Sequence, residues 1–179
     1  MHVIIRRTFF RFPTRVDPTT VYRKRFREER LLGWSNEQLF DLVSNVNEYQ
    51  YFLPACIRST VTKKISDHEI IAELEIGVPP LIQETYESHI KLNPPHLLTA
   101  SSREGRLFHH LDTTWKFTAG VPGVKRTSQV LFTLDFEFKN AVYAKLVHSV
   151  FDQMAKQTMS AFTERAERLF GPEFPVDKD

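Results

Sequence analysis

The chain has 179 residues, of which 41% are hydrophobic, so it is long enough and apolar enough to bury the core of one domain. This composition excludes disordered and collagen-like chains, and a single cysteine, Cys56, excludes an internal disulfide, a thiolate zinc site and an iron–sulfur cluster. The net charge is +2, but residues 1–30 hold nine basic and three acidic residues, so the rest of the chain is mildly acidic.

The N-terminal 16 residues contain four arginines and no acidic residue, with apolar side chains between them. This pattern is typical of a mitochondrial import presequence, and it lacks the long apolar core of a secretory signal. The alternative is a basic terminus without a targeting role. We expect a basic N-terminal segment over residues 1–18, a folded domain over 19–171 and a loose tail over 172–179.

A second basic run, residues 23–27, precedes two glutamates. Clustered basic residues attract nucleic-acid phosphates. In a strand, however, Arg23, Arg25 and Arg27 would line one solvated face. We favour a solvated strand face and expect no nucleic-acid partner.

The first predicted elements are a strand over residues 22–32 and two short helices after it. Ser35 and Gln38 have the spacing of a capping box, which predicts a helix beginning at Ser35. Asn47 is predicted to cap a second short turn that ends before Pro54.

Residues 56–139 change to the two-residue alternation of strands that face an apolar core on one side. Turn-forming residues, mainly proline, glycine, serine and aspartate, divide this region into six strands joined sequentially. Because such a sheet exposes one apolar face, it needs a cover.

The only predicted element long and apolar enough for that cover is a helix over residues 140–170. It has an apolar stripe at three- and four-residue steps and is predicted to be capped by Asn140 and ended by Gly171. We therefore predict an α+β fold in which a curved antiparallel sheet of about seven strands wraps around one long C-terminal helix.

Motifs for catalysis are missing from the sequence, which has no phosphate-binding glycine loop, HExxH helix, GxSxG elbow or EF-hand loop. The adjacent His109 and His110 would point to opposite faces of a strand, which disfavours a shared metal ion. We expect no metal and no cofactor. Cys56 has no histidine close in sequence and is interpreted as a small buried hydrophobe.

Glu84 and Tyr86 are candidate interior polar groups, because they share the alternation of Ile82 and Ile90. An inward carboxyl or phenol needs a hydrogen-bonding partner, cavity water or a ligand. The alternative is that Glu84 lies near the rim of the sheet.

Three ordered segments carry a family resemblance: residues 49–56 (YQYFLPAC), 73–80 (ELEIGVPP) and 105–117 (GRLFHHLDTTWKF). They resemble the successive signatures of the coenzyme Q-binding proteins, which belong to the polyketide cyclase and START lipid-transfer superfamily. The resemblance runs from about Tyr22 to Pro172. Two departures concern ligand preference: Ala55 stands where an aromatic residue commonly precedes the cysteine, and His109 stands where asparagine is usual.

The resemblance implies a helix-grip (START-like) fold with an apolar tunnel between the sheet and the final helix. It implies a lipid chaperone and carrier, not an enzyme, that binds ubiquinone or its late precursors and supports respiratory electron transport and ubiquinone biosynthesis. It also implies peripheral contact with the matrix side of the mitochondrial inner membrane, with ubiquinone-biosynthetic or respiratory-chain proteins as further partners. The targeting interpretation of residues 1–18 agrees with this.

Site residues follow from the predicted strand faces and helix stripe together with the resemblance. Trp115 is expected to pack against the quinone ring or the first isoprenes, and Glu84, Tyr86 or Thr158 to hydrogen-bond a quinone oxygen. The expected ligand-binding residues are Leu74, Ile76, Glu84, Tyr86, Leu111, Trp115, Phe132, Phe136, Val147, Phe151, Met154 and Thr158.

A tunnel mouth that contacts the membrane is expected at the turns near residues 78–81 and 106–108, where one turn would open to release the tail. The alternative is that these side chains merely close the core. The expected mouth residues are Val78, Pro79, Pro80, Leu81, Arg103, Arg106, Leu107 and Phe108.

Two other function classes are alternatives. An aromatase/cyclase-like enzyme acting on a polyketide-type ring would need an acid/base residue inside the tunnel, for which Glu84 or Tyr86 would have to serve. A ribosome-associating module would need phosphate contacts, which the acidic body of the chain disfavours.

Overall fold

The computed structural model describes residues 23–78, 82–103, 105–106, 108–139 and 141–175, and it leaves the side chains of Val78, Ile82 and residues 141–152 undescribed. The N-terminal segment expected over residues 1–18 lies outside the described residues. Within them, three helices and seven strands follow one another as β1 (Arg23–Leu32), α1 (Asn36–Ser44), the 3₁₀ helix η1 (Val46–Tyr51), β2 (Cys56–Ser66), β3 (Glu69–Val78), β4 (Ile82–Asn93), β5 (Leu97–Ser102), β6 (Phe108–Ala119), β7 (Ser128–Phe138) and α2 (Ala141–Phe170).

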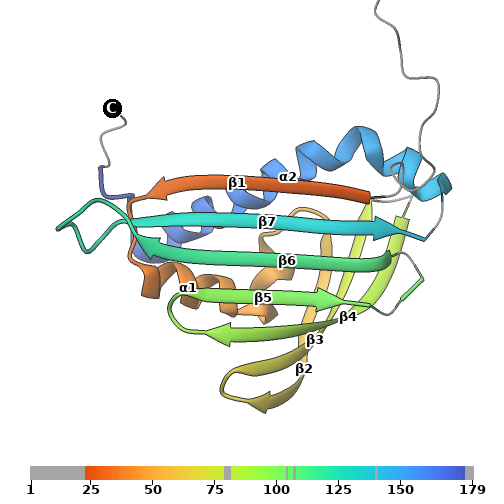
Figure 1. Cartoon of the computed structure of the whole chain (residues 1–179), viewed down its shortest axis with the longest axis horizontal. Coiled ribbons are helices and arrows are strands. Elements are labelled where there is room, and N and C mark those ends of the chain that lie inside the picture. Colours follow the sequence, from red (N-terminus) through yellow and green to blue (C-terminus); the bar gives the residue numbers. More distant parts are fainter. Residues whose placement is uncertain (1–22, 79–81, 104, 107, 140, 176–179) are drawn as a thin grey trace, which may run out of the picture.

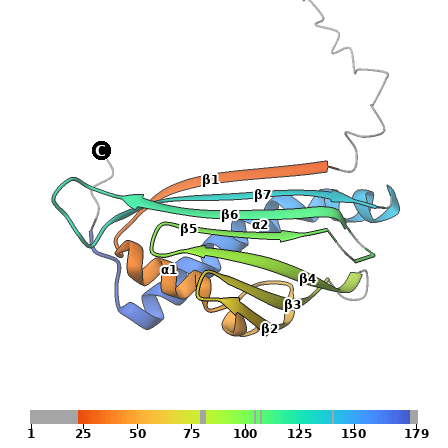
Figure 2. The same ribbon diagram turned by 60° about the horizontal axis from the view of Figure 1, so that its bottom comes forward.

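The described strands form one antiparallel sheet in the order β1-β7-β6-β5-β4-β3-β2 (Figure 1). β1 closes on β7, so the first strand of the chain lies beside the last one. The helices lie on one side of the sheet, and α2 runs along that side (Figure 2). This arrangement confirms the predicted α+β helix-grip fold.

Alternation along the strands explains why the sheet has one apolar face. Four alternate side chains of β7 are buried: Val130, Phe132, Phe136 and Phe138. The residues between them face the opposite side, which is largely polar. A sheet with one apolar face is stable only when that face is covered, and α1 and α2 supply the cover.

The predicted capping box starts α1. The Ser35 hydroxyl accepts a hydrogen bond from the backbone N–H of Gln38, and the Gln38 side chain accepts one from the backbone N–H of Ser35. These two bonds satisfy amides that the first turn of a helix leaves without partners. The buried face of α1 holds Leu39, Phe40, Leu42 and Val43.

The predicted role of Asn47 as a helix cap is wrong. The 3₁₀ helix begins earlier, at Val46, and the residue before it makes no side-chain capping bond. The Asn47 side-chain oxygen instead accepts a hydrogen bond of 2.7 Å from the backbone N–H of Val61. Asn47 therefore joins η1 to β2. The sequence could not indicate this role, because the Val61 amide that Asn47 binds is distant in the chain.

The prediction of a loose tail over 172–179 is wrong at its start. Gly171 ends α2 with a φ of 84°, and its carbonyl accepts a hydrogen bond of 3.2 Å from the Trp34 indole. The backbone N–H of Phe174 donates to Gly33 O at 3.1 Å, and the N–H of Gly33 donates to the Glu173 carboxylate at 2.8 Å. A Cβ on Gly33 would lie 2.1 Å from the Phe174 carbonyl oxygen, so only glycine permits this docking.

Candidate functional site

Small side chains form the floor of the apolar face in the middle of the sheet. Ala72 on β3 lies opposite Ser88 on β4, and Ala100 on β5 lies opposite Thr113 on β6. The buried core divides into two clusters, and the larger one contains most of the bulky side chains around this floor. The short side chains of the floor leave room above this part of the sheet.

A partly open hollow of about 170 Å³ lies above this floor. We call it the inner cavity. Its walls come from β3 to β7 below and from η1, α2 and the segment after η1 above. The lining residues are Val46, Tyr49, Leu53, Leu74, Ser88, Ile90, Leu98, Ala100, Thr113, Trp115, Phe132, Leu134, Thr158 and Phe162.

Four residues expected to bind ligand line the inner cavity: Leu74, Trp115, Phe132 and Thr158. Others among them belong to the core outside its lining, namely Ile76, Tyr86, Leu111 and Phe136. Met154 and Glu84 are half-buried and are not part of the lining. The side chains of Val147 and Phe151 lie outside those that the structure describes.

Most of the remaining lining residues escaped prediction because they are small or come from the loop-like region before β2. Ser88 shares the inward alternation that identified Glu84 and Tyr86, so the same signal could have found it. Tyr49 and Leu53 lie in the first of the three family segments. Thr113 shares the inward alternation of Leu111 and Trp115, so the same signal could have found it too. Ala100 gives no such indication, since a short side chain marks a hollow only when its neighbours on adjacent strands are known.

Aromatic rings build the end of the inner cavity nearest α1. The Trp115 ring centroid lies 4.4 Å from that of Phe132 and 4.7 Å from that of Phe162 on α2. Phe162 in turn packs edge-on against Tyr49 and Phe52 at 5.4 and 5.1 Å. Such tilted and edge-on pairs hold one another in fixed positions, so this wall is preformed.

Four hydroxyl groups reach the inner cavity. Tyr49 donates to the backbone carbonyl of Val43, and Thr158 donates to that of Met154 at 3.0 Å. The hydroxyls of Ser88 and Thr113 have no hydrogen-bonding partner among the described residues. Because Thr158 already donates its proton to Met154, it cannot hydrogen-bond a quinone oxygen, which only accepts, and it can accept a hydrogen bond only from a donor such as a quinol hydroxyl.

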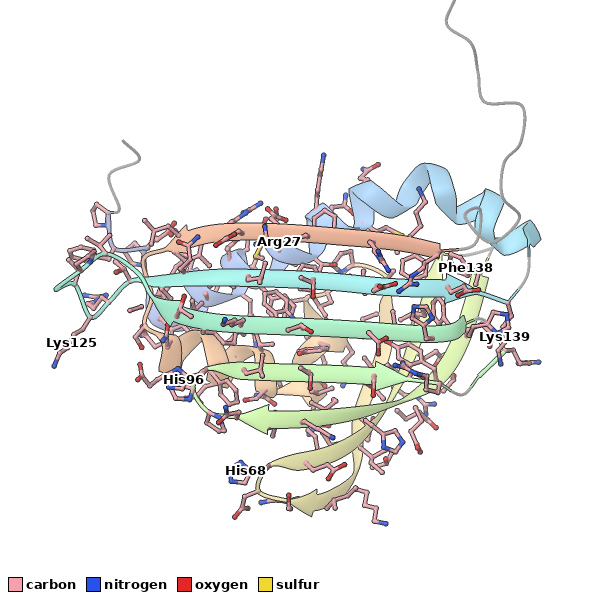
Figure 3. All side chains as sticks on the ribbon, viewed as in Figure 1. Arg27, His68, His96, Lys125, Phe138 and Lys139 are labelled. Carbon is pink, nitrogen blue, oxygen red and sulfur yellow. The ribbon has the colours of Figure 1, made fainter. Side chains whose placement is uncertain are left out.

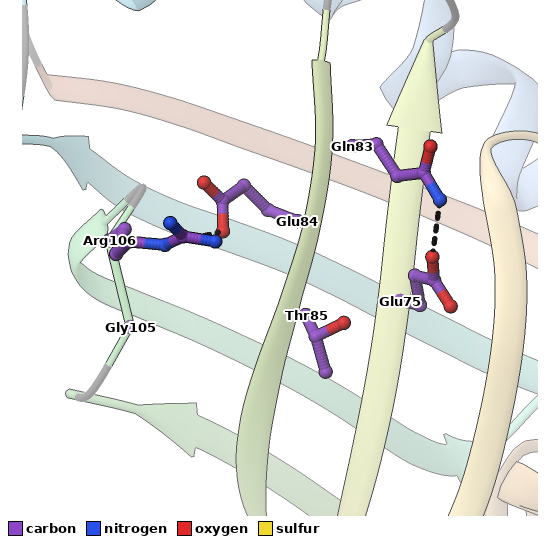
Figure 4. Close-up of a pocket in the computed structure, with 6 residues that line it drawn as sticks. All are labelled: Glu75, Gln83, Glu84, Thr85, Gly105 and Arg106. Carbon is purple, nitrogen blue, oxygen red and sulfur yellow. Dashed lines mark hydrogen bonds and ion pairs between the residues drawn. The ribbon is translucent and has the colours of Figure 1, made fainter.

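A second hollow, the rim pocket, opens to the surface beside the β5–β6 turn (Figure 4). It has a volume of about 420 Å³ and is lined by Glu75, Gln83, Glu84, Thr85, Gly105 and Arg106. The Glu84 carboxylate lies 3.7 Å from the Arg106 guanidinium, and their side chains are 13% and 89% exposed. Glu84 thus points inward but sits at the rim, with an exposed cation as its partner.

The β5–β6 turn is fastened at this end of the sheet. Lys139 donates a hydrogen bond of 2.7 Å to the carbonyl of Gly105, and Figure 3 shows Phe138 and Lys139 at the end of the sheet opposite Lys125. Gly105 has a φ of 117°, and a Cβ there would lie 3.7 Å from the Tyr86 Cβ. The turn therefore lies directly over Tyr86.

Phe108 is not an exposed mouth residue, contrary to expectation. It is 6% exposed, and its ring packs at 5.2 Å from Phe138 and 5.6 Å from Phe136. The register of β6 and β7 shifts between Phe108 and His110, so an irregularity turns Phe108 inward where simple alternation would turn it outward.

Of the other expected mouth residues, Arg103 is held in an ion pair, and most of the rest lie outside the part of the chain that the structure describes. Arg103 forms a two-pronged ion pair with Asp112, at 2.7 and 3.0 Å, so its guanidinium is already engaged on the outer face. Val78 ends β3, and its side chain is not described. Pro79, Pro80, Leu81 and Leu107 lie outside the described residues.

The interior offers little acid or base chemistry. Burial raises the pKa of Tyr86 and of Tyr49, so both phenols stay neutral and serve as donors instead of bases. Burial also raises the pKa of the Cys56 thiol, which lowers its reactivity. Within the described residues, no three histidine, cysteine or acidic side chains gather as a metal site, and no helix is long and apolar enough to cross a membrane.

The basic run of β1 lies on the outer face and is neutralised there. Arg23 binds Asp135 through two hydrogen bonds of 2.9 and 2.7 Å, and Arg25 binds the same carboxylate at 2.9 Å. His110 Nε2 lies 3.1 Å from it. These contacts, led by Arg23, hold the pKa of Asp135 well below its usual range.

We expect Asp135→Asn to destabilise the fold by roughly 1–2 kcal/mol near pH 7, since charge-assisted bonds are lost and two arginines lose their partner. Because the folded pKa is depressed, the contribution of Asp135 is complete above the unfolded pKa of about 3.9 and disappears as pH falls through the folded value. Urea unfolding of both proteins from pH 7 to pH 3 should show the difference shrinking with acid. Asp41→Asn, at an exposed position of α1, is the control. A stability difference between Asp135→Asn and the original protein that does not change with pH would contradict the role given to Asp135.

Comparison with known proteins places these features in context. The family described as polyketide cyclase / dehydrase and lipid transport matches residues 33–163. Coenzyme Q-binding protein COQ10 homolog B, mitochondrial, from Xenopus laevis is 38% identical over 83% of this chain and 60% of its own length. Coenzyme Q-binding protein COQ10, mitochondrial, from Drosophila melanogaster is 32% identical over 84% of this chain and 63% of its own length. The chain thus spans somewhat under two thirds of the length of these two curated relatives.

Among solved structures, the Zhui aromatase/cyclase from a Streptomyces species superposes with a TM-score of 0.69 over 82% of this chain and 95% of that one. The sequence identity is 14%, so this likeness concerns the fold. The helix-grip arrangement of sheet and C-terminal helix is common to both.

Proposed function

Because this chain belongs to the polyketide cyclase / dehydrase and lipid transport family and, within it, to the coenzyme Q-binding proteins, we propose that it binds ubiquinone or a late precursor and carries it as a lipid chaperone. The observation that carries the proposal is the inner cavity, a preformed hollow of about 170 Å³ with mostly apolar and aromatic walls. No reaction is part of this proposal, and ubiquinone is cargo, not a cofactor.

Transfer of a polyprenyl chain from bilayer to protein gains little free energy, because both environments are apolar. Water is the barrier, since every methylene group exposed to it costs about 0.8 kcal/mol. A carrier therefore only needs to match the affinity of the membrane. A small, mostly apolar hollow that holds one part of the ligand suffices for this task.

The rim pocket is the proposed exit toward the membrane. Arg106 is 89% exposed and carries a charge that anionic lipid headgroups attract. The Arg106 guanidinium lies 3.7 Å from the Glu84 carboxylate, so this exposed ion pair is weak, and Arg106 can exchange Glu84 for a lipid headgroup. We place the peripheral contact on the matrix side of the mitochondrial inner membrane, in keeping with the mitochondrial names of the two relatives.

Support of respiratory electron transport and of ubiquinone biosynthesis follows as part of the proposal. A carrier that lowers the cost of moving quinone through water supplies it both to the enzymes that finish its ring and to those that reduce it. Proteins of these two kinds are the proposed partners, and residues 1–18 are the proposed import signal.

A cyclase would need a proton acceptor within reach of a bound ring. The inner cavity is lined by hydroxyl groups and apolar side chains, and Tyr49 is a neutral phenol there. The nearest carboxylate of the β4 inward face, Glu84, lies at the rim beside Arg106. A ribosome-binding role gains no support from β1, whose Arg23 and Arg25 are bound to Asp135.

Mass spectrometry of the full chain, purified under native conditions from a respiring host, tests the proposal. We expect a prenylated quinone to leave the protein when it is denatured. A protein isolated free of quinone, which also takes none from quinone-loaded vesicles, would contradict it. Turnover of a polyketide-type substrate with a pH-dependent rate would favour the cyclase instead.

A further inference from the structure

Ser88 is a buried polar group that the packing of the protein leaves unused. The residue is 5% exposed and lines the inner cavity. Among the described residues nothing hydrogen-bonds its hydroxyl. Because this hydroxyl faces the hollow and not packed side chains, it is available to hydrogen-bond a molecule that enters the cavity.

Thr113 provides a second unused hydroxyl on the opposite side of the same floor. Ser88 lies on β4 and Thr113 on β6; Ala100 of β5 is directly opposite Thr113 and pairs on its other side with Ile90, two residues along β4 from Ser88. Two strand spacings, together roughly 10 Å across the sheet, and an offset of two residues, about 7 Å along it, place Ser88 and Thr113 diagonally across the floor. The short side chain of Ala100 leaves the space between the two hydroxyls open.

The volume of the inner cavity suits a ring better than a chain. An engineered apolar cavity of about 150 Å³ holds one benzene molecule. At about 170 Å³ the inner cavity has room for a single six-membered ring, whereas a polyprenyl tail of several isoprene units does not fit. The Trp115 indole and the Leu98 side chain supply apolar surfaces for such a ring.

The inward face of β4 runs from this cavity to the rim. It passes from Ile90 and Ser88 through Tyr86 to Glu84, which lines the rim pocket. The Tyr86 ring packs edge-on against Phe108 at 6.2 Å. A ligand whose ring lies over Ser88 has to pass the Tyr86 ring, which packs against Phe108, for its tail to reach the rim.

We propose that the inner cavity is a site for the quinone ring, in which Ser88 and Thr113 donate hydrogen bonds to the carbonyl oxygens on opposite sides of the ring, while the tail leaves through the rim pocket. This inference rests on the proposed function and adds the orientation of the ligand to it. Since serine and threonine hydroxyls both donate and accept, the same two residues hold the quinol, whose hydroxyls are donors. The site therefore binds both redox forms.

Quenching of tryptophan fluorescence in the full chain tests the proposal, because Trp115 lines the cavity. The probes are a dimethoxy-methyl-benzoquinone with a ten-carbon tail, the corresponding quinol, and a polyprenol without a ring. We expect Ser88→Ala and Thr113→Val each to weaken binding of quinone and quinol roughly three- to tenfold, the equivalent of one hydrogen bond. Polyprenol binding should not change, nor should any binding in Thr114→Val, the matched control on the outer face.

A second measurement distinguishes a hydrogen bond from a change of packing. The infrared carbonyl stretch of the bound quinone should lie at lower frequency in the unsubstituted protein and move upward in Ser88→Ala. Unchanged quinone affinity in both variants, or an equal loss for the polyprenol, would overturn the ring site while the carrier function stands. If the unsubstituted protein binds none of the three probes, the proposed function fails with it.

Discussion

Ala100→Leu is expected to remove bound quinone almost completely while the protein remains folded and as stable as before. Ala100 forms the middle of the floor of the inner cavity. A leucine there adds three carbon atoms to a hollow of about 170 Å³, where they are buried without displacing other side chains. Filling a void stabilises a protein by up to about 0.8 kcal/mol for each buried methylene, so the melting temperature should be unchanged or higher.

The measurement is the amount of quinone that copurifies per mole of protein, with the melting temperature recorded on the same sample. We expect at least a tenfold fall in quinone. Thr99→Leu introduces the same side chain at the neighbouring position, whose side chain faces the other side of β5, and should retain quinone at the original level. Full retention of quinone by Ala100→Leu would show that the ligand lies elsewhere, even if the protein is stable.

Much of this architecture could be predicted because the local pattern and the tertiary structure agree. The alternation in β7 shows directly which side chains are buried, and the Ser35–Gln38 box fixes the start of α1. In both cases the signal comes from residues that are close in sequence. Trp115 and Phe132 could be assigned to the cavity wall for the same reason.

Other features depend on partners that are distant in sequence. Asn47 finds the amide of Val61, and the backbone after α2 finds Gly33. Neither pairing leaves a local signal. Phe108 was misplaced because a register irregularity, which involves two strands at once, reverses the side to which it points.

The inner cavity itself is the hardest feature to predict from sequence. It exists because short side chains of three adjacent strands, Ser88, Ala100 and Thr113, lie close together on one sheet face. Each is unremarkable within its own strand. Only the register of the strands shows that the short side chains coincide, and only the hydrogen-bond network shows that two of their hydroxyls are unused.

Trp115→Ala is expected to cause the largest loss of stability of any single change to the site. The indole is buried and packs against Phe132, Phe162 and Phe117, so its removal leaves a large void beneath α2. Truncation of a buried tryptophan costs about 3–5 kcal/mol, which in a protein of this size lowers the melting temperature by roughly 10 °C. Circular dichroism during heating measures this shift.

Trp115→Phe is the matched control, because it keeps an aromatic ring against α2 and should lose less than half as much. The quinone content of the two variants then separates two roles of the indole. If Trp115 acts mainly by holding Phe132 and Phe162 in place, phenylalanine restores both stability and binding. If the indole itself is the surface on which the ring lies, phenylalanine restores stability but leaves quinone binding weak, since a smaller ring offers less area. A melting temperature within about 2 °C of the original protein for Trp115→Ala would contradict the preformed aromatic wall from which both possibilities follow.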